Sequence, residues 1–160
     1  MATPEYVLSL REKVGHDLLW LPGVTAVVLR DGPGGGREVL LVRRADNGEW
    51  TPVTGIIDPG EQPAVAGARE VLEEADVVAE PVALVRVHAR EPMQYDNGDR
   101  AQYLDLTFSF RFVSGEPSPA DGENTDAAWF ALDALPDMTE DMLARVRAAT
   151  RTSAQADFTR

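Results

Sequence analysis

Four acidic residues and one arginine between positions 61 and 74 have types and spacing suited to binding a metal ion. They are Glu61, Arg69, Glu70, Glu73 and Glu74. On a helix that advances roughly 100° per residue, the last three acids share one face. Like charges three and four positions apart repel, so this face needs either water or a compensating cation. Hard divalent ions take oxygen ligands and share them with substrate phosphates. The segment therefore indicates either a solvated helix face or a metal site that can hold a diphosphate.

The surroundings of these acids favour the metal site. A loop with the turn-forming residues Gly55, Pro59 and Gly60 precedes the helix and leaves room for a diphosphate. Glu61 can fold back toward the acidic side, and Arg69 lies between the two helix faces, where its forked donors can hold a carboxylate. The opposite face is expected to pack on a sheet through Val65, Ala68, Leu72 and Ala75. Metal ions at such a site offset phosphate charge, orient a water and stabilise the leaving oxygen.

The segment resembles the box of the Nudix hydrolase (MutT-like) family, G-x5-E-x7-R-E-U-x-E-E-x-G-U, where U is a bulky aliphatic residue. Eight of its nine specified positions are present: Gly55, Glu61, Arg69, Glu70, Val71, Glu73, Glu74 and Val77. Asp76 stands where the family has glycine, and Thr54 stands where a second glycine is frequent. We expect Asp76 to adopt a left-handed backbone at some cost without abolishing activity, because its side chain is short. We expect Thr54 to narrow the approach to the metal.

The resemblance implies an α/β/α sandwich with a mixed β-sheet, an α/β fold. It also implies hydrolysis of a nucleoside diphosphate linked to another group, with Mg²⁺ or Mn²⁺ as cofactor. By this likeness the metal ligands are Glu70, Glu74, Glu73 and the main-chain carbonyl of Thr54. The catalytic set is Glu73, Glu123, Arg69 and Glu61, in which Glu61 and Arg69 orient the acids. Glu123 binds a further metal or serves as the general base.

The substrate is expected to meet residues on both sides of the box. The candidates are Arg44, Gly55, Tyr95 and Tyr103. Arg44 enters the loop before the box, where a phosphate contact and a surface role are equally plausible. Arg90 and the two tyrosines flank the Asn97-Gly98 turn, where they either orient a base or simply pack between strands.

The elements that position these residues alternate without the regularity of a doubly wound sheet, which favours a mixed sheet between helices. We expect helices over 3–15, 62–75 and 138–149, and strands over 24–29, 38–42, 82–89 and 101–113. A glycine-rich turn over 31–36 joins the first two strands, and residues 45–60 form a loop. Trp129-Phe130 begins a short last strand. Residues 1–20 form a lead-in, 21–150 the hydrolase domain and 151–160 a flexible tail.

Composition limits the function classes. The 160 residues suit one domain, and the absence of cysteine excludes thiolate zinc sites, cysteine nucleophiles and the chemistry of the Nudix-like isopentenyl diphosphate isomerases. A net charge of −12 makes duplex nucleic acid a poor partner. The N-terminus lacks the pattern of a signal peptide and no apolar run is long enough to span a bilayer, so we expect a cytoplasmic protein without membrane contact.

Three functions remain open on the sequence alone. The first is hydrolysis of an NDP-sugar or ADP-ribose type of substrate. The second is pyrophosphate release from nucleoside triphosphates, including oxidised ones. The third is a non-catalytic Nudix module that binds nucleotides, which the intact acids disfavour. The partner is then a small nucleotide, and a homodimer is possible.

Overall fold

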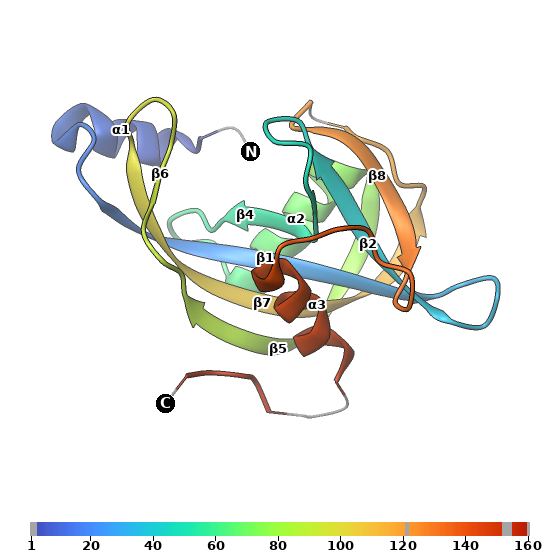
Figure 1. Cartoon of the computed structure of the whole chain (residues 1–160). Coiled ribbons are helices and arrows are strands. Elements are labelled where there is room, and N and C mark those ends of the chain that lie inside the picture. Colours follow the sequence, from blue (N-terminus) through green and yellow to red (C-terminus); the bar gives the residue numbers. More distant parts are fainter. Residues whose placement is uncertain (1–2, 121, 152–154, 160) are drawn as a thin grey trace.

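The computed structural model describes residues 3–120, 122–151 and 155–159. Its helices are α1 (Glu5–Val14), α2 (Pro63–Ala75) and α3 (Glu140–Thr150). Its strands are β1 (Leu19–Asp31), β2 (Arg37–Arg44), β3 (Trp50–Thr51), β4 (Val53–Ile56), β5 (Val77–Ala89), β6 (Met93–Gln94), β7 (Arg100–Gly115) and β8 (Asn124–Ala131). Figure 1 shows how these elements follow one another along the chain.

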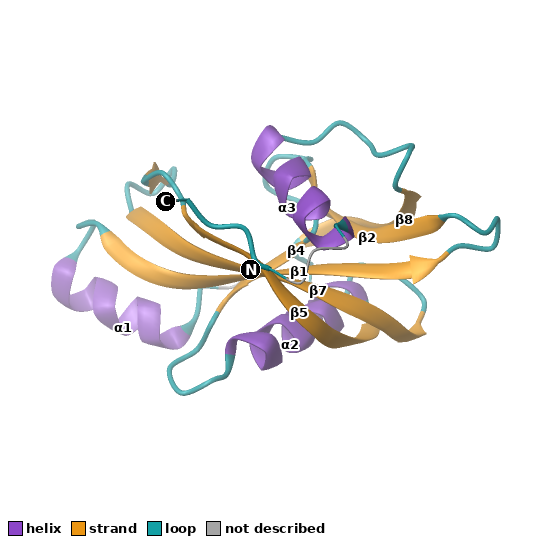
Figure 2. Cartoon of the chain, turned by 90° about the horizontal axis from the view of Figure 1, so that it is seen from below, coloured by secondary structure: helices purple, strands orange, loops and turns teal. Residues whose placement is uncertain are grey.

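The strands form one mixed sheet between two helices, which confirms the predicted fold class. The main strand order is β3-β2-β1-β7-β5, with β4 paired to β1, β6 to β7 and β8 to β2. The long pairing of β1 with β7 is parallel, and the other pairings are antiparallel. Helices α2 and α3 lie on opposite faces of this sheet (Figure 2).

The centre of β1 is buried on both faces, which explains its continuous apolar run. Val28 packs in the core cluster that contains Val71 of α2. Its neighbour Val27 points the other way, into the cluster that contains Val146 of α3. Successive residues of a strand point to opposite faces, so each helix is fixed on its own side of the same strand.

Two expectations about strands need correction. The predicted loop over 45–60 contains β3 and β4, and β4 pairs with β1 from Gly23↔Ile56 to Ala26↔Val53. Its glycine and proline content hid a strand that is held by long-range pairing. Trp129-Phe130 lies near the end of β8 and does not begin it, since the strand starts at Asn124.

The chain ends lie beside strands. Residues 152–154 and 160 of the predicted flexible tail lie outside the described residues. In the described part of the tail, the N–H of Asp157 donates to Val85 O (2.8 Å), and the N–H of Val87 donates to Asp157 O (2.9 Å). This part of the tail therefore runs along β5. At the other end, Val7 of α1 is buried in a cluster with Leu21.

Asp76, the departure from the family glycine, ends α2 with the expected left-handed backbone (φ 54°, ψ 35°), and its N–H donates to Leu72 O (3.1 Å). We expect Asp76→Gly to raise the free energy of unfolding by about 0.5–1 kcal/mol, because glycine adopts this conformation without the steric penalty. Asp76→Ala should lower it by about 1 kcal/mol. Chemical denaturation of both variants checks this, and the reverse order would contradict the conformational argument.

Candidate active site

Helix α2 turns Glu70 and Glu74 toward the body of the protein, contrary to expectation, while Glu73 stays exposed and Ala68 and Ala75 pack on the core as expected. Its buried residues are Ala66, Gly67, Glu70, Val71, Glu74 and Ala75. Val65 and Leu72, expected against the sheet, are 58% and 49% exposed. Small residues decide this orientation: a Cβ at Gly67 would lie 2.8 Å from Phe110 Cζ, so the helix approaches the sheet on its glycine side. Glu70 and Glu74 are consequently only 6% and 5% exposed.

Arg69 joins three carboxylates around the start of the acidic face. Its Nε and Nη2 donate to the two oxygens of Glu61 (2.9 and 3.0 Å) in a fork. Its Nη1 donates to Glu70 Oε1 and to Glu73 Oε2, both at 3.0 Å. A further bond from Nη2 reaches the carbonyl of Ile56 (3.3 Å), at the end of β4. The contact expected of Arg69 is present, and one guanidinium fixes the acids relative to the sheet.

Gly55 gives Glu70 the room it occupies. A Cβ built on Gly55 would lie 2.2 Å from Glu70 Oε1 and 2.3 Å from its Cδ. Gly55 itself is held in β4 opposite Val24 of β1, and its neighbour Thr54 lies opposite Thr25. The carboxylate of Glu70 therefore lies directly against the backbone of β4. The same strand carries Thr54, whose carbonyl is the predicted metal ligand.

Asn124 is a site residue that the sequence did not reveal. It is buried, and its Nδ2 donates to Glu74 Oε2 (3.0 Å). The preceding residue, Glu123, accepts a bond at its carbonyl from the N–H of Ala45 (2.9 Å). These contacts bring the chain at Glu123 and Asn124 against the acidic end of α2. Position 124 belongs to no motif, and only its place after Glu123 hinted at it.

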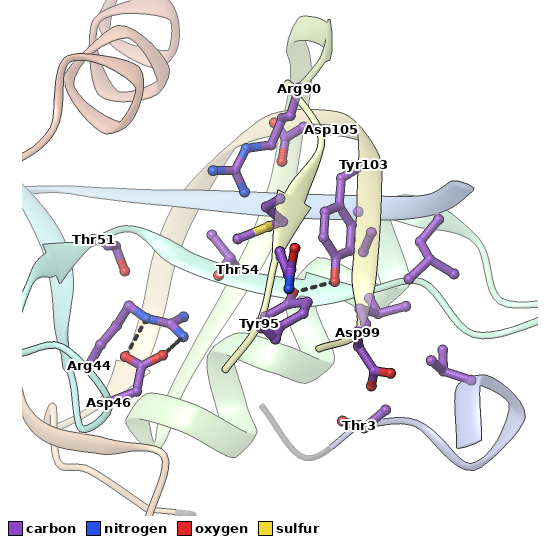
Figure 3. Close-up of a pocket in the computed structure, with 18 of the residues that line it drawn as sticks. Thr3, Arg44, Asp46, Thr51, Thr54, Arg90, Tyr95, Asp99, Tyr103 and Asp105 are labelled. Carbon is purple, nitrogen blue, oxygen red and sulfur yellow. Dashed lines mark hydrogen bonds and ion pairs between the residues drawn. The ribbon is translucent and has the colours of Figure 1, made fainter. Parts of the chain in front are cut away.

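A cavity of about 560 Å³ adjoins this acidic site, within the range of roughly 300–1,000 Å³ typical of ligand pockets. The four predicted substrate contacts, Arg44, Gly55, Tyr95 and Tyr103, all line it, together with Thr54 (Figure 3). Thr54 and Gly55 thus connect the cavity to the acids of α2.

The predicted substrate-binding side chains already form hydrogen bonds within the protein. Arg44 is forked onto Asp46, with Nε–Oδ1 and Nη2–Oδ2 distances of 2.9 and 2.5 Å. The hydroxyls of Tyr95 and Tyr103 lie 2.8 Å apart (Figure 3). Burial, together with the bond to Tyr95, raises the pKa of the Tyr103 hydroxyl, so it stays protonated and available as a donor.

The family model for the NUDIX domain matches residues 20–150. The chain belongs to the Nudix family. The match includes α2 with all of its acids, the cavity strands and α3. None of the described helices has both the length and the apolar character required to cross a membrane.

Individual relatives carry different activities in their names. The chain is 37% identical over 103 residues to the NAD-capped RNA hydrolase NudC of Pseudomonas aeruginosa, covering 63% of this chain and 34% of that protein. It is 33% identical over 105 residues to the human 8-oxo-dGDP phosphatase NUDT18, covering 62% and 30%. This Nudix chain therefore spans about a third of the length of these two relatives.

Solved structures agree on the fold. A NUDIX hydrolase from Nitrosomonas europaea matches with a TM-score of 0.63 and 27% identity, covering 81% of this chain and 88% of that one. Nudix hydrolases generally use divalent metals.

The donor set of this Nudix chain fits a hard cation, although the acids are not arranged around one. Among the described residues, no three His, Asp or Glu side chains are close enough together to hold a metal ion. Arg69 forms ion pairs with Glu61, Glu70 and Glu73. The groups beside Gly55 are carboxylate and carbonyl oxygens, which Mg²⁺ and Mn²⁺ accept. The carboxylate of Glu70 occupies the space that a Cβ at Gly55 would fill, next in the chain to Thr54.

Burial raises the pKa of Glu70 to about 7, and the neighbouring Arg69 only partly opposes this shift. Between pH 4.5, the ordinary pKa of a glutamate, and about pH 7, Glu70 keeps a proton in the folded protein that it has already released in the unfolded chain. The free energy of unfolding should therefore fall as pH rises through this window, by on the order of 3 kcal/mol at pH 8 without metal.

Glu70→Gln removes this titration. We expect its stability to change less than that of the wild type between pH 4.5 and 7, and to exceed it at pH 8 in chelator. Denaturation series at several pH values measure both. Parallel stability curves for the two proteins would contradict the assignment of the shift to Glu70.

Proposed function

We propose that the protein hydrolyses the diphosphate linkage of a nucleoside diphosphate derivative, of the NDP-sugar or ADP-ribose type, with Mg²⁺ or Mn²⁺ as cofactor. The observation that supports this most is the arrangement of the α2 acids: Arg69 holds Glu70 and Glu73, and Glu70 lies against Gly55 at the border of the cavity. We further propose that it acts in the cytoplasm on a small nucleotide, as a monomer or homodimer.

The chain's own residues suggest how the reaction proceeds. Glu70, Glu74, Glu73 and the carbonyl of Thr54 would hold the metal. When bound, the cation would offset the charge of the diphosphate and acidify a water. Arg69 and Glu61 keep the ligands in place. Glu123, near the buried Glu74, accepts the proton of the attacking water, whose oxygen bonds to phosphorus while the bridging P–O bond breaks.

A second substrate class is favoured by the names of several relatives. The human protein that is 33% identical over 105 residues bears the name 8-oxo-dGDP phosphatase. Oxidised nucleotides and nucleoside triphosphates therefore belong in the same test. The third possibility, a non-catalytic nucleotide-binding module, predicts binding without turnover.

One hydrolysis panel separates these functions. It contains NDP-sugars, ADP-ribose, dinucleoside polyphosphates, and normal and oxidised nucleoside di- and triphosphates, each with Mg²⁺, with Mn²⁺ and with chelator. Products are identified by mass. Metal-dependent cleavage of an NDP-sugar or ADP-ribose supports the first proposal, and preference for an oxidised nucleotide supports the second. No cleavage, with nucleotides still raising the melting temperature, would indicate the binding module and contradict the hydrolase.

A further inference from the structure

Four arginines line the cavity, and their contacts differ. They are Arg11, Arg44, Arg90 and Arg145. Arg11 donates to three backbone carbonyls, those of Gly15, Asp17 and Arg100. Arg44 is held by Asp46, and Arg145 is 1% exposed and bonded to Asp105 and Asp141. These three guanidiniums already serve internal contacts.

Arg90 is the exception among the cavity arginines. Its closest carboxylate atom is Asp141 Oδ2, 3.6 Å from its Nε, and no group in the described part of the chain forms a hydrogen bond with its guanidinium. The side chain is 31% exposed. Figure 3 shows the guanidinium extending into the cavity on the side of Thr54. Arg90 and Thr54 thus line the same cavity, and Thr54 belongs to β4, the strand that borders the acidic site.

The backbone holds Arg90 in this position. Its N–H donates to the carbonyl of Tyr103 (2.9 Å), and its own carbonyl accepts a bond from Gln102 Nε2 (2.9 Å). Both partners lie on β7, next to β5, so the side chain starts from a fixed point of the sheet. A side chain on a fixed backbone loses less entropy on binding a ligand than a side chain on a mobile loop.

Two carboxylates, Asp105 and Asp141, lie among the arginines on the Arg90 side of the cavity. Asp141 accepts bonds from Arg86 (3.0 Å) and Arg145 (2.7 Å) in addition to its longer contact with Arg90. Asp105 pairs with Arg145 (3.0 Å). Three guanidiniums thus share two carboxylates, and among these three only Arg90 forms no hydrogen bond to either carboxylate. The cavity lining also includes the carboxylates of Asp46, Glu49, Asp96 and Asp99, so the case for Arg90 rests on its unused donors: its guanidinium forms no hydrogen bond with any described residue.

We propose that Arg90 binds the diphosphate of the nucleotide, donating from its Nη atoms to phosphate oxygens, and that in this chain it takes the phosphate contact for which the sequence offered Arg44. Guanidinium and phosphate match in geometry, and such charge-assisted bonds are strong. The inference rests on the proposed function in one respect, that the ligand carries a diphosphate.

The test measures binding and not turnover. Inorganic pyrophosphate, ADP and adenosine are titrated in chelator against the wild type, Arg90→Gln, Arg90→Lys and Arg86→Gln, and dissociation constants are obtained from the rise in melting temperature. Arg86→Gln is the matched control, because Arg86 bonds to the same Asp141 but does not line the cavity.

Arg90→Gln should weaken pyrophosphate and ADP by about tenfold and leave adenosine unchanged, because one charge-assisted contact to phosphate is lost. Arg90→Lys should recover part of the loss, and Arg86→Gln should bind as the wild type does. Equal losses for adenosine and ADP, equal losses in Arg86→Gln, or no binding of pyrophosphate by the wild type would overturn the proposal. Pyrophosphate carries no nucleoside, so this result is independent of whether the hydrolysis panel finds a substrate.

Discussion

Gly55→Ala is expected to reduce kcat by about 100-fold or more, because displacing a catalytic carboxylate by about 1 Å has effects of this size. The added Cβ would lie 2.2 Å from Glu70 Oε1 and 2.3 Å from both Cδ and Cγ. Gly55 is paired with Val24 inside the sheet, so its backbone does not yield. Glu70 must leave its position, and its bond to Arg69 (3.0 Å) is lost with it.

A glycine without neighbours provides the control. A Cβ at Gly34, in the turn between β1 and β2, meets nothing within 4 Å, so Gly34→Ala should keep wild-type kcat. Glu70→Ala and the double variant Gly55→Ala with Glu70→Ala extend the test. If Gly55 acts through Glu70, Glu70→Ala and the double variant should be equally inactive, since the effects of the two substitutions are then not additive. A fully active Gly55→Ala protein would refute the geometric role of this glycine.

The sequence predicted the ends of α2 and the identity of its acids, but not the direction in which they face. Residues 62–75 were expected as a helix, and Pro63–Ala75 is one. Of the residues predicted to face the sheet, Ala68 and Ala75 pack on the core, but Val65 and Leu72 are exposed, because a hydrophobic pattern ranks large apolar residues above small ones. The sheet instead receives Gly67, beside Phe110, because close approach depends on side-chain size. This orientation of α2 buries Glu70 and Glu74. A hydrophobic pattern alone disfavours burying two carboxylates, but a metal site would use them.

The cavity was even less predictable from the sequence than the orientation of α2. Its lining comes from segments that the parallel pairing of β1 with β7 brings together, from Leu19↔Ala101 to Leu29↔Arg111. A local sequence pattern does not predict such a long-range pairing. Tyr95 and Tyr103 were found because both flank a recognisable turn. Arg145 was not, since a buried arginine on α3 resembles any helix-surface residue in sequence, and only tertiary contact places it beside Asp105.

Glu74→Gln is the second variant with a large expected effect, a loss of about 100-fold or more in kcat with Mg²⁺, since a ligand charge worth several kcal/mol is removed. The sequence placed Glu74 on an exposed face, but it is buried, with Asn124 Nδ2 donating to its Oε2 (3.0 Å). A glutamine keeps an oxygen for this bond and nearly the same volume, so the fold should persist.

Burial gives this variant a second signature. A buried carboxylate is costly when charged, so Glu74→Gln should be at least as stable as the wild type in chelator at pH 8 while binding Mg²⁺ more weakly. Denaturation with and without Mg²⁺ measures both effects beside kcat. Glu140→Gln, on the exposed start of α3, is the control and should change neither. A folded Glu74→Gln protein with wild-type kcat would contradict its role as a ligand. Lower stability in chelator would show instead that Glu74 holds the fold, because a structural carboxylate and a metal ligand respond oppositely to loss of charge.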